Sequence, residues 1–207
     1  GATSARGATE YEFNRALAGA VAGELVRRGT DARLVNGDGP TDRRSARGSA
    51  ARGARLLVSI HHDSVQPRYL SSWTYAGAVR PYSDRFSGFS LFLSRKNGFQ
   101  EVSRACASSV GREMRAAGFA PSLYHAERIP GESKPFADRA NGVHYYDNLV
   151  VLKSTRAPAI LVEAGVIVNR DEELLLGDPQ RRTRMAVAIA DGISRCLSAL
   201  RRGQPPF

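Results

Sequence analysis

The chain has 207 residues, of which 42% are hydrophobic and 24% charged, so it can form one folded domain with an ordinary apolar core. No apolar run approaches the roughly 20 residues of a membrane-spanning helix, and we expect no membrane span. The formal net charge of +10 favours an anionic partner such as a cell-wall polymer, a lipid surface or nucleic acid. Because neither an RNA-binding aromatic pattern nor a compact basic tail is present, nucleic acid is not the expected partner.

The first predicted helix begins after Thr9, which forms a capping-box pattern with Glu12. This helix ends at Gly29. A short strand is a candidate over 34–35, and a second helix is expected from 41 to about 53. The apolar face of the first helix consists of residues at helical spacing, namely Phe13, Leu17, Val21 and Leu25.

The apolar run Leu56–Ile60 predicts a strand that is buried on both faces. A loop is expected over 64–87, and the next strand over Phe89–Leu93. A third helix follows and ends near Gly118. Its apolar stripe consists of Phe99, Val102, Cys106, Val110 and Met114.

Residues 119–147 are expected to form a long irregular insert or lid, since a connection of this length is more often functional or mobile than merely structural. Leu149–Leu152 and Ala159–Glu163 are predicted to be strands. The last helix is expected to begin with Asp178 as its N-cap and Pro179 at its first position.

Strands that alternate with helices predict an α/β fold. We expect a single domain over 1–202 with a mostly parallel twisted sheet, flanked by helices on both faces, and a tail over 203–207. In such folds the functional side chains gather at the carboxyl ends of the strands. Unusual polar residues follow two of the predicted strands, at 61–63 and at 163.

The residues at these strand ends are histidines and carboxylates. Glu163 closes an apolar run, and a buried carboxylate is costly unless it is paired, hydrogen-bonded or near a metal. A pair with an arginine is the structural alternative. His61, followed by His62 and Asp63, is a candidate metal ligand because zinc prefers histidine nitrogen and carboxylate oxygen. Glu10, in a first helical turn, needs no functional explanation by itself.

Cys106 and Cys196 have no metal-site spacing. Both fall on apolar stripes of predicted helices, so buried thiols are expected. A disulfide between the two helices is the alternative for an exported protein.

Three sequence blocks, in this order, resemble the zinc-dependent N-acetylmuramoyl-L-alanine amidases of the bacterial cell wall. They are EYEFNRAL at 10–17, SIH at 59–61 and LVEAGVIVN at 161–169. The likeness covers nearly the whole chain. It implies hydrolysis of the amide bond between N-acetylmuramic acid and L-alanine of peptidoglycan, in cell-wall remodelling or cell separation.

The resemblance also implies roles for individual residues. Glu10 and His61 match zinc ligands, and Glu163 matches the catalytic glutamate next to the metal. Four further residues are expected to bind substrate or to support the site, namely Asn14, His62, Asp63 and Asn169.

The family pattern begins with a strand that ends in a Gly-His pair, whose histidine is a zinc ligand. No histidine precedes Glu10 here, so we expect the sequence to lack that strand and its ligand. The alternative is that His62, His125 or His144 completes the site.

Some amidases of this kind are held inactive by a helix that covers the zinc. The segment 119–147 is a weak candidate for such a lid, through Glu127 or Glu132. Its basic residues are candidates for contact with stem-peptide carboxylates, namely Arg128, Lys134 and Arg139. We further expect a monomer in the periplasm or outside the cell, with a possible activator protein; a signal segment is absent from the sequence.

Three other functions remain open. The chain can be a zinc hydrolase of another amide, such as a peptide or poly-γ-glutamate bond. It can be a non-catalytic peptidoglycan-binding domain with a degenerate metal site. A nucleic-acid-binding domain is favoured by charge alone.

Overall fold

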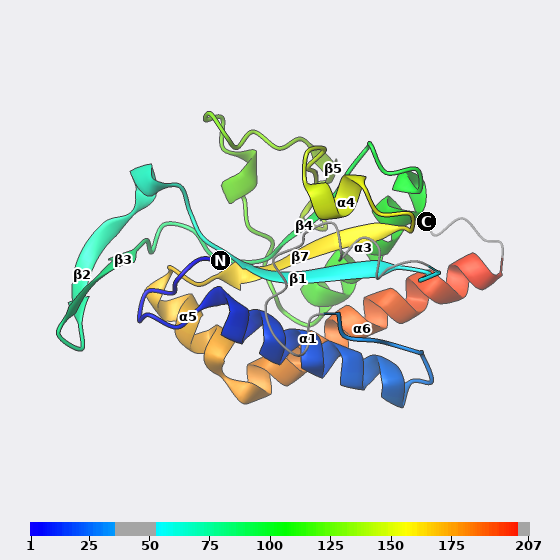
Figure 1. Cartoon of the computed structure of the whole chain (residues 1–207), viewed down its shortest axis with the longest axis horizontal. Helices are drawn as coiled ribbons and strands as arrows, with labels where there is room; N and C mark the ends of the chain where they lie inside the picture. Colours follow the sequence, from blue (N-terminus) through cyan, green and yellow to red (C-terminus); the bar gives the residue numbers. More distant parts are fainter. Residues whose placement is uncertain (36–52, 203–207) are drawn as a thin grey trace.

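The computed structural model describes residues 1–35 and 53–202, and it confirms the expected α/β class (Figure 1). A five-stranded sheet has the order β1-β7-β4-β6-β5, and a separate hairpin contains β2 and β3. The strand expected over 34–35 is not formed, and the helix expected from 41 lies outside the described residues up to 52. The strands of the main sheet are β1 (Leu57–Asp63), β4 (Ser90–Leu93), β5 (Phe136–Asp138), β6 (Val143–Tyr145) and β7 (Ala159–Val166).

The sheet is mixed. β1 runs parallel to β7, and β4 runs parallel to β6. The β4–β7 and β5–β6 pairs are antiparallel. The parallel β1–β7 pair places the carboxyl ends of two strands side by side, which is the arrangement on which the expected site depends. The expectation that β1 is buried on both faces is wrong, because β1 lies at the edge of the sheet and is mostly half-buried.

The first helix, α1 (Glu10–Arg27), begins with the expected capping box. The Thr9 hydroxyl accepts a hydrogen bond from the backbone N–H of Glu12, and the Glu12 carboxylate accepts one from the backbone N–H of Thr9 at 2.7 Å. This reciprocal pair satisfies two N–H groups that a helix start leaves free. It fixes the position at which Glu10 enters the helix.

Two long helices, α3 (Gln100–Ala116) and α6 (Pro179–Arg201), pack closely against each other. Asp178 caps α6 and Pro179 occupies its first position, as expected. Cys106 of α3 and Cys196 of α6 form a disulfide, so the expectation of buried free thiols is wrong and the alternative holds. Their apolar stripes face each other, and this brings residues that are 90 positions apart into bonding range.

The sheet is flanked by helices as expected, with the long helices α1, α3 and α6 on one face and a short helix on the other (Figure 1). Along β7, Ile160 and Val162 face the cluster formed with α1, α3 and α6. Leu161 points to the opposite face, where it packs with Leu152 of the short helix α4 (Val150–Lys153). The alternation explains why the strand is apolar throughout.

Leu149–Leu152 was predicted to be a strand, and this prediction is wrong, because α4 occupies most of that range. The apolar run is too short for its period to separate helix from strand. Asn97 donates hydrogen bonds to the carbonyls of Leu152 and Ala157, a tertiary contact that orders this turn.

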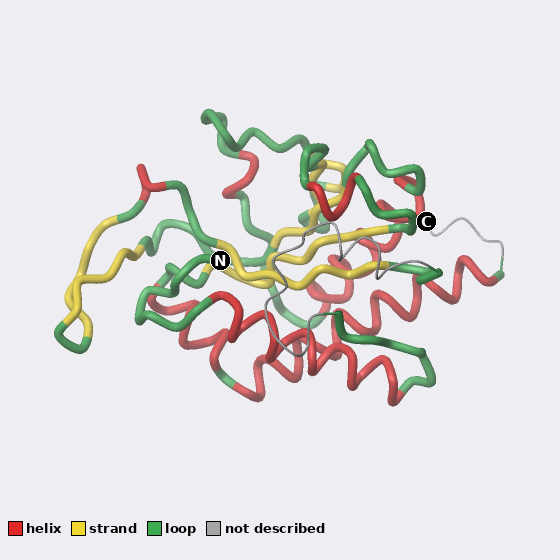
Figure 2. Tube along the Cα trace, in the orientation of Figure 1, coloured by secondary structure: helices red, strands yellow, loops and turns green. Residues whose placement is uncertain are grey.

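The segment expected to be a loop over 64–87 contains the short helix η1 (Pro67–Tyr69), β2 (Ser71–Tyr75) and β3 (Ala78–Tyr82). The hairpin extends away from the main sheet (Figure 2). Its turn residues Ala76 and Gly77 both have positive φ angles, 49° and 78°. An Ala-Gly pair is a weaker hairpin signal than Asn-Gly, which is why the sequence did not reveal the turn.

The segment 119–147 contributes the short helix η2 (Tyr124–Ala126) as well as β5 and β6. Asn169 caps α5 (Arg170–Gly177), where its side chain accepts hydrogen bonds from the backbone N–H groups of Asp171 and Glu172. Among the described residues, no helix combines the length and apolar character needed to cross a membrane.

Candidate active site

The carboxyl ends of β1 and β7 lie beside the N-terminal end of the chain (Figure 1). His61 of β1 is paired in register with Glu163 of β7. Between His61 and Asp63 the register shifts, so that Asp63 is opposite Val166. Between these two pairs, β1 advances by two residues while β7 advances by three. Such a bulge changes the direction in which the side chains at the strand ends point.

Glu10, the first residue of α1, contacts His61 of β1. The Oε1 atom of Glu10 lies 2.8 Å from the Nδ1 atom of His61. Asn14 donates to the same oxygen at 3.0 Å, and the backbone N–H of Ala2 donates to Oε2 at 3.0 Å. Burial alone would raise the pKa of Glu10, but these hydrogen bonds and the His61 charge outweigh it and lower the pKa to about 2. Glu10 is therefore a fixed carboxylate at neutral pH.

Glu163 has the opposite environment. Its Oε2 atom is buried and has no hydrogen-bond partner among the described residues. Burial raises the pKa of Glu163 well above its ordinary value, and the negative charges of Asp63 and Glu10 raise it further. A carboxyl group whose pKa is raised in this way binds a proton more readily than a free glutamate does, which suits a group that takes up and returns a proton.

Asn14 links Glu10 to a second histidine. The Oδ1 atom of Asn14 lies 2.8 Å from the Nδ1 atom of His62, while its amide nitrogen donates to Glu10. His62 is 4% exposed, and its ring lies 5.4 Å from that of Phe13. Burial lowers the pKa of His62 to about 4, so this histidine is neutral at pH 7. The contact places His62 and Asn14 beside the Glu10–His61 pair, next to the site they were expected to support.

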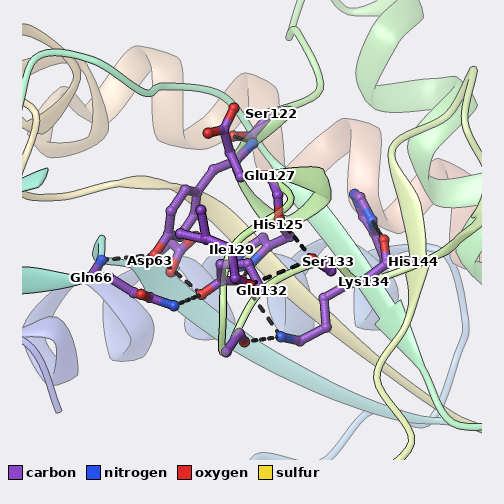
Figure 3. Close-up of polar contacts among 12 residues, drawn as sticks. Asp63, Gln66, Ser122, His125, Glu127, Ile129, Glu132, Ser133, Lys134 and His144 are labelled. Atoms are coloured by element: carbon purple, nitrogen blue, oxygen red, sulfur yellow. Dashed lines mark hydrogen bonds and ion pairs between the residues drawn. The ribbon is translucent and has the colours of Figure 1, made fainter. Parts of the chain in front are cut away.

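A third group adjoins the site through Asp63. The Oδ2 atom of Asp63 lies 2.7 Å from Nε2 of His125, and Nδ1 of His125 lies 2.9 Å from Oε2 of Glu132 (Figure 3). Burial would lower the pKa of His125, but the hydrogen bonds and charges of the two carboxylates raise it to about 9. The sequence analysis did not link these residues. Asp63 and His125 are 62 positions apart, and no local pattern joins them.

Other residues from the sequence analysis have different partners. The amide of Asn169 donates to the carbonyl of Phe86 at 3.0 Å, so Asn169 fixes the start of α5 and the preceding loop. Glu127 accepts a hydrogen bond from the hydroxyl of Tyr69 at 3.1 Å and lies 3.6 Å from Arg85. Glu127 is thereby held by the loop after β1.

The donor types at Glu10 and His61 fit zinc, because a carboxylate oxygen and an imidazole nitrogen already converge there. Within residues 1–35 and 53–202, however, no group of three or more His, Cys, Asp or Glu side chains is arranged to hold a metal ion. The three histidines considered as a further ligand each direct Nδ1 to another partner. Nδ1 is hydrogen-bonded to Asn14 in His62, to Glu132 in His125 and to the carbonyl of Lys134 in His144.

Comparisons with known proteins cover nearly the whole chain. Residues 1–195 match the family model for N-acetylmuramoyl-L-alanine amidase. The amidase AmiA of Salmonella typhimurium is 31% identical over 208 aligned positions, which cover 93% of this chain and 70% of AmiA.

Solved structures show the same fold. Ami1, an N-acetylmuramyl-L-alanine amidase from Mycobacterium smegmatis, superposes with a TM-score of 0.75 at 22% identity, covering 96% of this chain and 82% of Ami1. The catalytic domain of the amidase CwlV from Bacillus (Paenibacillus) polymyxa gives a TM-score of 0.70 at 26% identity, covering 96% of this chain and 90% of that domain.

Proposed function

Because this chain belongs to the N-acetylmuramoyl-L-alanine amidase family, which acts on peptidoglycan, we propose that its reaction depends on zinc and on the carboxyl group of Glu163. Glu10 and His61 would hold the metal. The observation that supports this proposal best is that Glu163, whose Oε2 atom is buried without a hydrogen-bond partner, is paired in register with His61, which contacts Glu10. An unsatisfied buried carboxyl is costly, and a catalytic function accounts for that cost.

The residues of the chain divide the chemistry between them. Zinc held by Glu10 and His61 would act as a Lewis acid toward the amide carbonyl and the attacking water. Glu163 takes the proton from the attacking water and delivers it to the amine of L-alanine as the bond breaks. Asn14 holds the Glu10 carboxylate toward His61 through its 3.0 Å hydrogen bond. Burial and the charges of Asp63 and Glu10 raise the pKa of Glu163, which makes it a stronger base than a free glutamate.

We also propose that the protein works in cell-wall remodelling or cell separation, as a monomer in the periplasm or outside the cell, with residues 1–202 as one catalytic domain. The disulfide between Cys106 and Cys196 supports a compartment outside the reducing cytosol. The net charge of +10 suits a wall polymer rich in carboxylates. We propose in addition that an activator protein regulates it.

The decisive experiment compares Glu163→Gln with His61→Ala on purified peptidoglycan. We expect Glu163→Gln to abolish release of stem peptides while zinc content is unchanged, since Gln cannot carry a proton. His61→Ala should lower both zinc content and release, because it removes a donor. Released peptides with a free L-alanine amine are measured by mass spectrometry, and zinc is measured by elemental analysis.

Glu172→Gln is the matched control, because Glu172 is also buried and accepts backbone hydrogen bonds from Gly88 and Val166. Folded Glu172→Gln protein should release stem peptides at nearly the normal rate. Near-normal turnover by Glu163→Gln would refute the role of Glu163. Wild-type protein that binds peptidoglycan without releasing peptides would instead favour a non-catalytic binding domain.

A further inference from the structure

His125 lies between two carboxylates at the edge of the site (Figure 3). Both of its ring nitrogens are engaged, one by Asp63 and the other by Glu132. The imidazole is 7% exposed, and its ring packs edge-on against that of Phe92 at 4.7 Å. The orientation of the ring is therefore fixed by the contacts with Asp63 and Glu132 and by packing against Phe92.

A second set of contacts holds Glu132. Its Oε1 atom accepts hydrogen bonds from the Tyr124 hydroxyl at 3.2 Å and from the side-chain amide of Gln66 at 3.1 Å. Its Oε2 atom, which faces His125, lies 3.5 Å from Nζ of Lys134. The backbone N–H of Gln66 donates to the Tyr124 hydroxyl at 2.7 Å, which joins the loop after β1 to η2. Glu132 is thus a fixed anchor, with partners on both oxygens.

On the other side of His125, both oxygens of Asp63 are occupied. Oδ2 meets His125, and Oδ1 accepts the backbone N–H of Ser64 at 2.8 Å. Asp63 stands two residues after His61 on β1, and its negative charge acts on Glu163. If His125 released Asp63, the backbone N–H of Ser64 alone would hold this carboxylate, and a shift of its charge would change the electrostatic field at Glu163.

We propose that His125 is a positioning residue for the amidase reaction: anchored by Glu132, it holds the Asp63 carboxylate at the end of β1 in a fixed orientation next to Glu163. This inference rests on the proposed function. If His125 has this role, the segment from η2 to Lys134 is part of the catalytic centre, because it supplies both His125 and Glu132. Removing that part would then impair turnover, whereas removing an inhibitory cover would increase it.

Two substitutions at His125 separate its two hydrogen bonds. The amide nitrogen of Gln reaches about as far as Nε2 of His, so His125→Gln keeps a donor toward Asp63 and loses the one toward Glu132. The amide nitrogen of Asn corresponds to Nδ1, so His125→Asn keeps the donor toward Glu132 and loses the one toward Asp63. Both variants remove the ring and its charge. A difference between them therefore reports which contact matters.

We expect His125→Asn to lower kcat by roughly 10- to 100-fold, as is usual for groups that orient active-site ligands, with KM changed less than about threefold. His125→Gln keeps the donor toward Asp63 but lacks the anchor at Glu132, so its kcat should fall severalfold less than that of His125→Asn. Turnover is measured on a soluble muramyl peptide at a fixed zinc concentration, and thermal unfolding of each variant is recorded beside it. Equal kcat for the two variants, or a higher kcat for His125→Asn, would overturn the proposal.

His144→Gln is the matched control. His144 is a second buried histidine next to the same segment, but its Nδ1 meets only the backbone carbonyl of Lys134, at 3.2 Å. We expect this variant to lose stability without losing kcat. A drop in kcat equal to that of His125→Asn would indicate a general packing effect and would count against the proposal.

Asp63→Ala provides a second route if His125→Asn does not fold. It removes the carboxylate that His125 is proposed to position, and kcat should fall as in His125→Asn. Normal kcat for Asp63→Ala would overturn the proposal. Wild-type protein without amidase activity would contradict the proposed function and this inference together. Active wild-type protein with equal His125 variants would contradict this inference alone.

Discussion

Three buried histidines show how neighbouring groups decide protonation. Burial lowers the pKa of His62 and of His144 to about 4 in each case. His125 is buried as well, but two carboxylates raise its pKa to about 9. At pH 7 the first two are neutral, whereas His125 is an imidazolium. The residues are of one type, and what distinguishes them is whether a carboxylate lies within hydrogen-bond distance.

The charge on His125 makes the stability of the protein depend on pH. A histidine whose pKa is raised in the folded state stabilises that state fully below its unfolded pKa of 6.5, and this contribution disappears as the pH rises through about 9. The contribution is on the order of 3 kcal/mol, at about 1.4 kcal/mol for each pKa unit.

We therefore expect the free energy of unfolding to fall between pH 6.5 and about 9, and His125→Gln to flatten that part of the curve. Urea denaturation at several pH values measures this slope. His62→Gln is the control, because the low pKa of His62 places its effect on the acidic side. An unchanged slope in His125→Gln would show that this histidine is not charged.

At the level of elements, the α3–α6 contact depends on one small residue. A Cβ atom added to Gly192 of α6 would lie 2.4 Å from Cα and 2.7 Å from the backbone nitrogen of Val110 on α3. The carbonyl of Gly192 also accepts a hydrogen bond from the hydroxyl of Ser109 at 2.9 Å. The two backbones approach this closely because no side chain separates them, and this approach accompanies the disulfide between the same helices.

We predict that Gly192→Ala lowers the free energy of unfolding by roughly 1–3 kcal/mol, because the added methyl group forces the two helices apart. Gly19→Ala on α1 is the control, since a Cβ there has no neighbour within 4 Å. That variant should be neutral or more stable by up to about 1 kcal/mol, because alanine favours a helix. Chemical denaturation of both variants tests the comparison, and equal stabilities would contradict it.

For the molecule as a whole, we expect the net charge of +10 to affect binding to the cell wall more than the chemistry at the site. Basic side chains and carboxylates of peptidoglycan attract each other over the screening length of the solution. We expect this attraction to hold the protein on the wall and to be sensitive to salt, whereas the short hydrogen bonds of Glu10 at the site are screened much less.

We expect binding of the inactive Glu163→Gln variant to purified peptidoglycan to fall severalfold between about 0.1 M and about 1 M salt, as the screening length shrinks from about 10 Å to about 3 Å. The bound fraction is measured by co-sedimentation. Peptidoglycan whose carboxylates have been amidated is the control, and it should bind weakly at either salt concentration. Salt-independent binding would show that the charge does not contribute.

Local patterns in the sequence were sufficient for several elements. The capping box at Thr9 and Glu12, the cap at Asp178 and the apolar run into His61 each predicted an element that the structure contains. These signals work because they depend on neighbours within one or two turns of chain. Local patterns do not show that Glu10, His61 and Glu163 act together; that proposal came from the resemblance to the amidase family. The structure brings these three residues close to one another.

Only the tertiary structure decided the remaining features. The disulfide joins residues 90 positions apart, and the contact of Asp63 with His125 spans 62 positions. Four-residue α4 is helical because of what packs on it, since its own apolar run fits a strand equally well. The protonation of His125 and the raised pKa of Glu163 likewise depend on burial and on charges supplied by distant segments. The sequence by itself therefore determined the helix starts, the central strands and the candidate reactive residues, whereas folding determined their surroundings, because electrostatic fields and packing depend on distance in space and not along the chain.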